Sequence, residues 1–188
     1  MPCRWYCRLV RVRAIAVAAL VLLIAAGCSS ASPRPATSPT TRAPLPAGTT
    51  PSTIAIMVCA KEANKEIALA LGETASISNP SWSDHRYSCR YSYAKGSFML
   101  SVQELSSEAE TTAYYDSLAA RLGKTRDLQG LGQGAFQTTD GSVVVRKDWK
   151  VLLVDDSGLP MQFGVPPTGS GSVAVTVGAV ILGCWAGD

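Results

Sequence analysis

The sequence predicts one α+β domain, built from an antiparallel sheet of about five strands and three helices in the order α-β-β-α-β-β-β-α. Three observations lead to this class: apolar residues recur at helical spacing after residue 54, five short segments are typical of strands, and a long apolar run closes the chain. Short turns between successive strands favour antiparallel pairing, and we expect the helices to pack on one face of the sheet. The length of 188 residues excludes two large domains.

The first 27 residues are typical of a secretory signal peptide. Four arginines lie before residue 14, and the thirteen residues from Ala14 to Ala26 are apolar and uncharged. This run is shorter than the ~20 apolar residues that cross a membrane. The sequence Ala25-Ala26-Gly27-Cys28 resembles a bacterial lipobox, which implies cleavage before Cys28 and acylation of its thiol. The alternative is ordinary cleavage that releases a soluble protein, in which Cys28 has no special role.

Residues 28–53 are predicted to form a tether between the lipidated cysteine and the domain. From Ser29 to Thr53 the chain holds five serines, six threonines and six prolines, with Leu45 as its one large apolar residue. Such a segment buries too little apolar surface to fold, and its prolines favour an extended chain. The tether is either a spacer across an envelope layer or a flexible leader, and its composition is also that of O-glycosylated stalks.

The globular domain is expected to span residues 54–188. Its first helix ends at Gly72 and has one apolar side, while the other side carries Lys61, Glu62, Lys65 and Glu66. The next segment alternates between apolar and polar residues on both sides of a glycine-containing turn. This alternation predicts a β-hairpin with strands at residues 87–93 and 98–102.

A second helix is predicted over residues 108–122. Ser107 and Glu110 form the pattern of a capping box, and Gly123 is a helix stop. Three short strands follow, separated by turns, at residues 135–138, 142–147 and 151–155. Residues 172–185 are apolar throughout and form too long a run for a typical strand, so we expect a buried third helix there.

The formal net charge of +3 belongs to the whole chain and not to the domain. Six of the 17 basic residues lie before residue 54, where there are no acidic residues, so the domain holds 11 basic and 14 acidic residues. A domain with net negative charge offers no positive field for phosphates, which argues against nucleic acid as a partner. We expect the acyl chains on Cys28 to provide the attachment to a membrane.

Three cysteines remain in the predicted domain, because the two in the signal peptide are removed and Cys28 would be acylated. Export favours disulfide formation, so we expect one disulfide among Cys59, Cys89 and Cys184. A Cys59–Cys89 bond would close a loop of about thirty residues and is the pairing we favour. A Cys59–Cys184 bond is the alternative, since two antiparallel helices would bring these residues together.

Candidate catalytic and metal-binding residues are few. His85 is the only histidine, so a serine-type catalytic site would need it as the general base. No G-x-S-x-G nucleophile elbow is present, and a surface turn is the simpler interpretation of His85. The cysteines and His85 are too scattered for the usual spacing of metal ligands. We therefore expect no metal and no cofactor, and a hydrolase that uses His85 remains the alternative function.

The glycine-rich sequence at residues 130–135, Gly-Leu-Gly-Gln-Gly-Ala, does not match the G-x-G-x-x-G fingerprint of dinucleotide binding. It also follows a predicted helix and leads into strands, whereas a phosphate-binding loop follows a strand and opens a helix. This sequence predicts a turn that requires positive φ angles, which glycine adopts freely.

A basic cluster beside a tryptophan is the candidate surface for binding. At the tip of a predicted hairpin, such a cluster can contact anionic lipid headgroups or envelope glycans, with the indole at the interface. The alternative is a solvated turn whose tryptophan folds back onto the sheet. The cluster consists of Arg146, Lys147, Trp149 and Lys150.

Several structural motifs accompany the lipobox and the tether. Cys59 lies near a helix start, Cys89 lies within a hairpin, Gly-Leu-Gly-Gln-Gly-Ala-Phe occupies residues 130–136, and Gly-Cys-Trp closes the domain. Together these features resemble the short secreted lipoproteins of high-GC actinobacteria, including mycobacterial types. The resemblance implies a protein anchored by lipid at the outer face of the cytoplasmic membrane, and it implies no catalytic residues. We expect a non-catalytic binding or interaction module for an envelope protein, lipid, glycan or apolar ligand.

Overall fold

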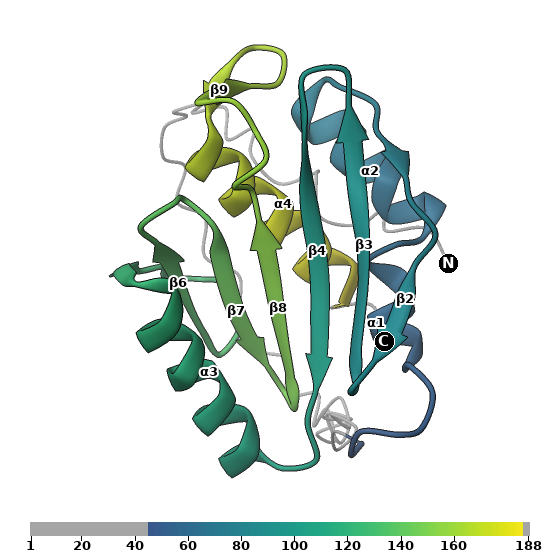
Figure 1. Cartoon of the computed structure of the whole chain (residues 1–188), viewed down its shortest axis with the longest axis vertical. Coiled ribbons are helices and arrows are strands. Elements are labelled where there is room, and N and C mark those ends of the chain that lie inside the picture. Colours follow the sequence, from purple (N-terminus) through teal and green to yellow (C-terminus); the bar gives the residue numbers. More distant parts are fainter. Residues whose placement is uncertain (1–44, 186–188) are drawn as a thin grey trace, which may run out of the picture. The chain divides into compact units, whose positions relative to one another are not determined.

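The computed structural model of the chain describes residues 45–185. The predicted signal peptide, the lipidation site Cys28 and most of the tether lie outside these residues. The described part forms an antiparallel sheet of eight strands with four helices, and a separate two-stranded sheet (Figure 1). The α+β class and the antiparallel sheet are confirmed, whereas the prediction of five strands and three helices was too low.

The elements have the following bounds. The helices are α1 Thr53–Met57, α2 Lys61–Leu71, α3 Glu108–Leu122 and α4 Ser170–Trp185. The strands of the main sheet are β1 Ser76–Ile77, β2 Ser81–Ser83, β3 Arg86–Tyr93, β4 Gly96–Glu104, β5 Lys124–Asp127, β6 Gly134–Thr138, β7 Val143–Lys147 and β8 Lys150–Asp155. The small sheet pairs β9 Gln162–Phe163 with β10 Thr168–Gly169. The main sheet has the order β1-β3-β4-β8-β7-β6-β5, and β2 also pairs with β3.

The first predicted helix is divided into α1 and α2, which corrects the prediction of one continuous helix. The backbone is extended at Ala60, with a ψ of 158°. Just before it, the Val58 carbonyl accepts a hydrogen bond from the Tyr91 hydroxyl at 2.6 Å, and Cys59 is disulfide-bonded to Cys89. These contacts hold the junction against β3, and because they are long-range, the helical spacing of apolar residues does not reveal the break.

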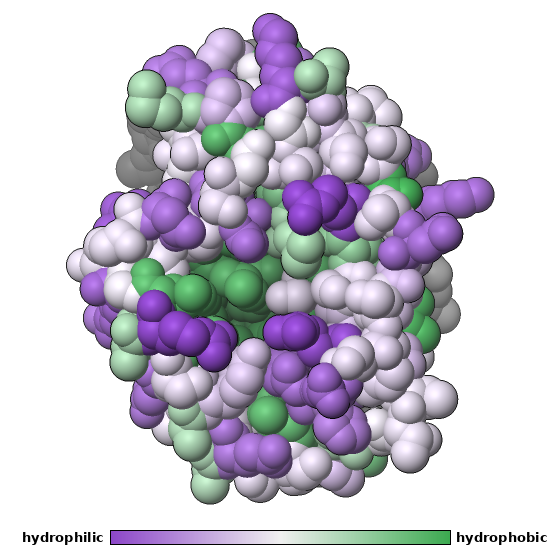
Figure 2. All heavy atoms as spheres, viewed as in Figure 1, coloured by the Kyte–Doolittle hydropathy of each residue, from purple (hydrophilic) through white to green (hydrophobic). Residues whose placement is uncertain are grey.

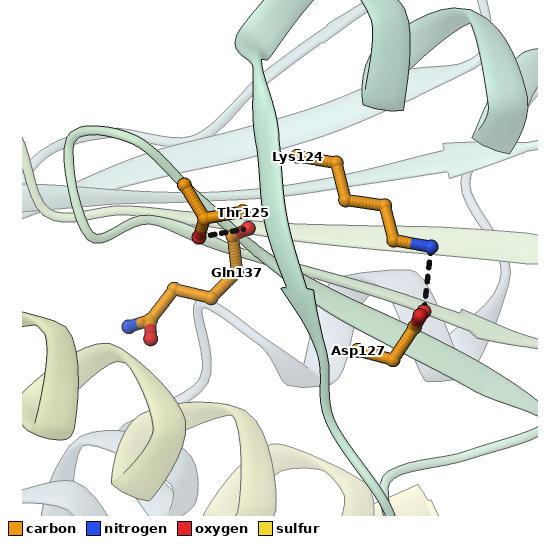
Figure 3. A network of polar contacts seen from close by, with 4 residues as sticks. All are labelled: Lys124, Thr125, Asp127 and Gln137. Carbon is orange, nitrogen blue, oxygen red and sulfur yellow. Dashed lines mark hydrogen bonds and ion pairs between the residues drawn. The ribbon is translucent and has the colours of Figure 1, made fainter.

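The strands that the sequence did not predict are short or polar. Strands β1 and β2 have two and three residues, and all four residues of β5 are exposed. Strand β5 is an edge strand, held to β6 by a bond from the Thr125 hydroxyl to the Gln137 carbonyl at 3.0 Å, while Lys124 and Asp127 form an ion pair at 2.6 Å (Figure 3). Charged residues on an edge strand discourage pairing with other chains.

Helices cover both faces of the sheet, which corrects the expectation that they share one face. Consecutive strand residues point to opposite faces, and in β8 Leu152 belongs to the core beneath α1, α2 and α4, whereas Val151 belongs to the core beneath α3. We call these sides the covered face, which carries Leu152, and the α3 face, which carries Val151. Helix α4 passes behind β4 and β8 in Figure 1.

The ends of the long helices follow the sequence signals closely. The Ser107 hydroxyl accepts a bond from the Glu110 amide at 3.1 Å, and Gly123 ends α3 with a φ of 70°. The Glu110 carboxylate accepts from the Ser106 amide at 2.8 Å, one residue before the position that a standard capping box uses. Helix α4 is fixed at its start because the Gln137 amide donates to the Gly171 carbonyl at 2.8 Å.

Candidate functional site

His85 lies in the tight turn between β2 and β3 and fastens the end of the tether to the domain. Both Asp84 and His85 have positive φ angles, of 51° and 58°. The His85 Nδ1 lies 3.0 Å from the Gly48 carbonyl, and because a carbonyl only accepts, Nδ1 is the donor. The Trp82 indole donates to the carbonyl of Thr49 at 3.0 Å, and its ring lies 6.0 Å from the His85 ring. In this structure the His85 side chain therefore binds the backbone of Gly48.

The last residues of the predicted tether are bound along one end of the sheet. The Ala47 amide donates to the Leu105 carbonyl at 3.1 Å. The amide of Ser52 donates to the Glu104 carboxylate at 3.1 Å, and the Ser52 hydroxyl donates to the same oxygen. Within residues 45–185, hydrogen bonds from this segment to the sheet thus begin at Ala47, and α1 starts directly after Ser52.

The disulfide joins Cys59 and Cys89, with an S–S distance of 2.16 Å, as the sequence predicted. The alternative bond between Cys59 and Cys184 is not formed. Cys184 lies in α4, where it is buried with a relative exposure of 6%.

The four residues of the predicted basic surface do not share one surface. Arg146 donates to the Thr112 hydroxyl at 2.6 Å, and its guanidinium lies 5.9 Å from the centre of the Tyr115 ring, on the α3 face. Lys147, the next residue of β7, points to the covered face and donates to the Trp185 carbonyl at the end of α4 at 3.2 Å. Trp149 is half-buried, and Lys150 is only 8% exposed.

A cavity of about 310 Å³ lies beside the connection between β5 and β6, which we call the glycine loop, residues 128–133. It is lined by the loop, by Asp127, Gly134 and Ala135 next to the loop, and by Tyr115 of α3. Gly130 and Gly132 have φ angles of 78° and 60°, which confirms the predicted turn. The sequence predicted this turn but not the cavity, because the approach of α3 is a tertiary contact.

The glycine loop is held in place by β7 and by the turn that follows it. A Cβ atom added to Gly132 would lie 2.5 Å from the Arg146 carbonyl oxygen, so this close approach requires glycine. The Gln133 amide donates to that carbonyl at 2.8 Å, and its side-chain oxygen accepts from the Asp148 amide at 2.8 Å. The loop conformation is therefore set by the protein itself.

Several polar groups at the cavity have no partner within residues 45–185. They are the backbone amides of residues 129–132, the Gln129 side chain and the Tyr115 hydroxyl. Burial raises the pKa of the Tyr115 hydroxyl, Asp127 raises it further, and Arg146 lowers it. The hydroxyl is thus protonated at neutral pH. Residues 129, 130 and 132 are exposed, and Leu131 and Tyr115 are half-buried, so these groups are open to a ligand. Polar groups that line a cavity and make no bond within the described chain mark a candidate binding site.

A second polar cluster lies near the start of α4. Asp156 is 2% exposed, and its carboxylate accepts from the Ser142 hydroxyl at 3.1 Å, while its Oδ2 has no partner among the described residues. Burial raises the pKa of Asp156. Burial acts in the same direction on nearby Asp140, but hydrogen bonds from Thr138 and Ser142 prevail and lower the pKa of Asp140. Asp156 and Ser142 are enclosed, whereas Asp140 is exposed, and its carboxylate is bonded to Thr138 and to the Ser142 amide.

The α3 face is uncovered over β3 and β4. Its serines and arginines bond to one another: the Ser81 and Ser88 hydroxyls lie 3.0 Å apart, and Arg90 donates to Ser97 at 3.0 Å. Figure 2 shows hydrophobic residues in a hollow near the middle of the view, bordered by strongly hydrophilic ones. Half-buried Leu153 of β8 packs against the core beneath α3.

Comparison of the chain with models of known families, with curated proteins and with solved structures finds no match. Within residues 45–185, His, Cys, Asp and Glu side chains form no group of three or more that would hold a metal ion. None of the helices in this part of the chain is long and apolar enough to cross a membrane.

Proposed function

We propose that this chain is a cell-envelope protein, anchored by acyl chains on Cys28 at the outer face of the cytoplasmic membrane, and that its domain is a non-catalytic binding module. The observation that carries the binding role is the cavity beside the glycine loop. Its unpartnered amides and hydroxyl lie in a loop that the protein holds in shape. A site prepared in this way binds without first having to order itself.

The surroundings of His85 favour binding over hydrolysis. A hydrolase would need His85 close to a nucleophile, with a further group to orient the ring. Instead, His85 Nδ1 bonds to the Gly48 carbonyl, and the ring lies against Trp82. The contacts of His85 suit a role in fixing how the domain is connected to its tether.

The anchor is tested by replacing the acylated residue. In a bacterial host with lipoprotein-processing enzymes, we expect the full chain to incorporate an alkyne-labelled palmitate and to fractionate with membranes. Cys28→Ser should abolish both, whereas Cys7→Ser, a matched change within the signal peptide, should alter neither. Membrane fractionation of Cys28→Ser equal to that of the unaltered chain would refute the lipid anchor.

The binding role is tested with the mature chain, residues 28–188, made soluble by Cys28→Ser. We expect saturable co-sedimentation with isolated cell-envelope fragments and no labelling by a fluorophosphonate probe for serine hydrolases. The absence of co-sedimentation would contradict the binding module. Labelling that His85→Ala abolishes would establish the hydrolase instead.

A further inference from the structure

We propose that the cavity beside the glycine loop binds a neutral, hydroxyl-rich ligand, namely one ring of a saccharide. This inference rests on the proposed binding function and names its ligand class. The cavity volume of about 310 Å³ lies near the lower end of the range for ligand pockets, which suits one small ring and not an extended chain.

The hydrogen-bonding groups at the cavity include both donors and acceptors. The amides of residues 129–132 donate, the Asp127 carboxylate accepts, and the Tyr115 hydroxyl and the Gln129 side chain do both. A ligand hydroxyl also donates and accepts. Neighbouring hydroxyls on one ring therefore match this mixed set, whereas a ligand with only one kind of group would leave part of it unsatisfied.

The charges near the cavity oppose ionic ligands of either sign. Asp127, at the wall, is already paired with Lys124 at 2.6 Å, and Arg146 donates to Thr112 at 2.6 Å. A further donor of Arg146, Nε, is buried behind the lining residue Gly134. An anion would meet the carboxylate of Asp127, and a cation would meet the row of amide donors, so a neutral ligand fits best.

The apolar part of the lining suits the C–H groups of a saccharide ring. Tyr115 is held by an edge contact with Phe136, at 5.0 Å between ring centres, and Leu128 and Leu131 lie in the same wall. Ligand sites commonly combine apolar and aromatic side chains with a few placed polar groups. The wall of this cavity has that composition.

The test is a titration followed by amide chemical shifts, on the mature chain, residues 28–188, with Cys28→Ser and uniform ¹⁵N label. The neutral probes are maltose, mannobiose and chitobiose, and the charged probes are inorganic phosphate and spermidine. We expect at least one saccharide to shift the amides of residues 129–132 saturably, with no such shift from phosphate or spermidine.

Two variants connect that binding to the cavity. Tyr115→Phe removes one hydroxyl, and we expect it to weaken binding by about 2- to 10-fold, the usual effect of one hydrogen bond. Gly134→Ala places a methyl group 3.5 Å from the Tyr115 Oη, an ordinary contact that narrows the cavity, so binding should weaken there as well. The matched controls are Tyr114→Phe, on the same helix, and Gly169→Ala, where an added Cβ meets nothing within 4 Å.

Three outcomes would overturn the inference. They are saturable shifts of residues 129–132 with phosphate or spermidine, saccharide binding that Tyr115→Phe and Gly134→Ala leave unchanged, and the absence of shifts with all three saccharides. If envelope co-sedimentation persists in that last case, the ligand class is wrong and the binding function stands. If co-sedimentation is also absent, both proposals fail.

Discussion

The two faces of the main sheet differ in how completely they are covered and in how their polar groups are used. On the covered face, α1, α2 and α4 enclose a continuous core that contains Tyr91, Phe98 and Leu152, and the disulfide joins this layer to β3. On the α3 face, one helix covers a smaller core around Phe136, while β3 and β4 remain open. The cavity with unpartnered polar groups lies at the β5–β6 edge of the sheet, lined by Tyr115, which packs against the α3 core, and by Leu128 and Leu131, which pack against the core of the covered face.

This difference indicates that one part of the domain provides most of its stability and another part is available for binding. The covered face provides most of the buried apolar surface, which is the main source of stability. The α3 face buries less apolar surface, and the edge of the sheet beside α3 presents exposed backbone amides and a shaped cavity that are open to a ligand. Substitutions on the two faces should therefore lower the free energy of unfolding by different amounts.

The largest effect is expected from removing the disulfide of the covered face. In the chain-entropy model, a bond that closes a loop of about thirty residues contributes about 3–4 kcal/mol. We expect the double variant Cys59→Ala, Cys89→Ala to lose about that much free energy of unfolding, measured by urea denaturation. Cys184→Ala serves as a single-site control for losing a buried thiol, and an equal loss there would remove the special role of the disulfide.

We expect a smaller difference in the free energy of unfolding when two consecutive leucines of β8 are each replaced by alanine. Leu152 is fully buried on the covered face, whereas Leu153 is half-buried on the α3 face. Leu152→Ala should lower the free energy of unfolding by about 3 kcal/mol, which is within the usual range for buried leucines. Leu153→Ala should lower it by about half of that or less. Equal losses in thermal or urea unfolding would contradict the difference between the faces.

Removing the hydrogen bonds that hold residues 47–52 against the domain should lower the free energy of unfolding by less than either change above. Each hydrogen bond from Trp82 or His85 contributes about 1 kcal/mol at most, because both bonds are exposed to water. We expect Trp82→Phe and His85→Ala to speed hydrogen exchange at residues 47–52 while leaving the exchange of α4 unchanged. Loss of protection throughout the domain would instead give these residues a role in the core.

The smallest expected effect is on how stability depends on pH. Two neighbouring carboxyl groups should change stability with opposite sign as the pH rises. Burial raises the pKa of Asp156 above 3.8, so its contribution to stability is complete below that value and is lost as the pH rises through the raised pKa. Relative to wild type, Asp156→Asn should therefore gain stability as the pH rises.

Asp140 provides the matched control. Its hydrogen bonds lower its pKa below 3.8, so its contribution is present above that value and is lost as the pH falls through the lowered pKa. Relative to wild type, Asp140→Asn should lose stability as the pH rises. Urea unfolding at a series of pH values measures both effects, and the same sign for the two variants would contradict this assignment.

The sequence predicts those elements whose pattern and end signals lie within the element itself. Helix α3 was predicted over its full extent because Ser107, Glu110 and Gly123 mark its ends, and the hairpin of β3 and β4 follows from strict alternation. The break between α1 and α2, and the short strands β1, β2 and β5, depend on contacts with β3 and β6. Such contacts leave no local pattern.

The candidate site could be predicted only in part for the same reason. The glycines at 130 and 132 indicate the turn, and the structure confirms their positive φ angles. Nothing local indicates that Tyr115, in a helix, lines a cavity with that turn. Conversely, the basic cluster is adjacent in sequence but divided in space, because alternation along β7 sends Arg146 and Lys147 to opposite faces. Lys150 pairs with Lys147 across the β7–β8 turn.

The most direct test of binding at the cavity is hydrogen exchange of residues 28–188, with Cys28→Ser, in the presence and absence of saturating cell-envelope fragments. We expect slower exchange at the glycine loop and at the residues around Tyr115, with no change in α2 or α4. Protection confined to α2 and α4, or to the open strands β3 and β4, would contradict the assignment of binding to this cavity.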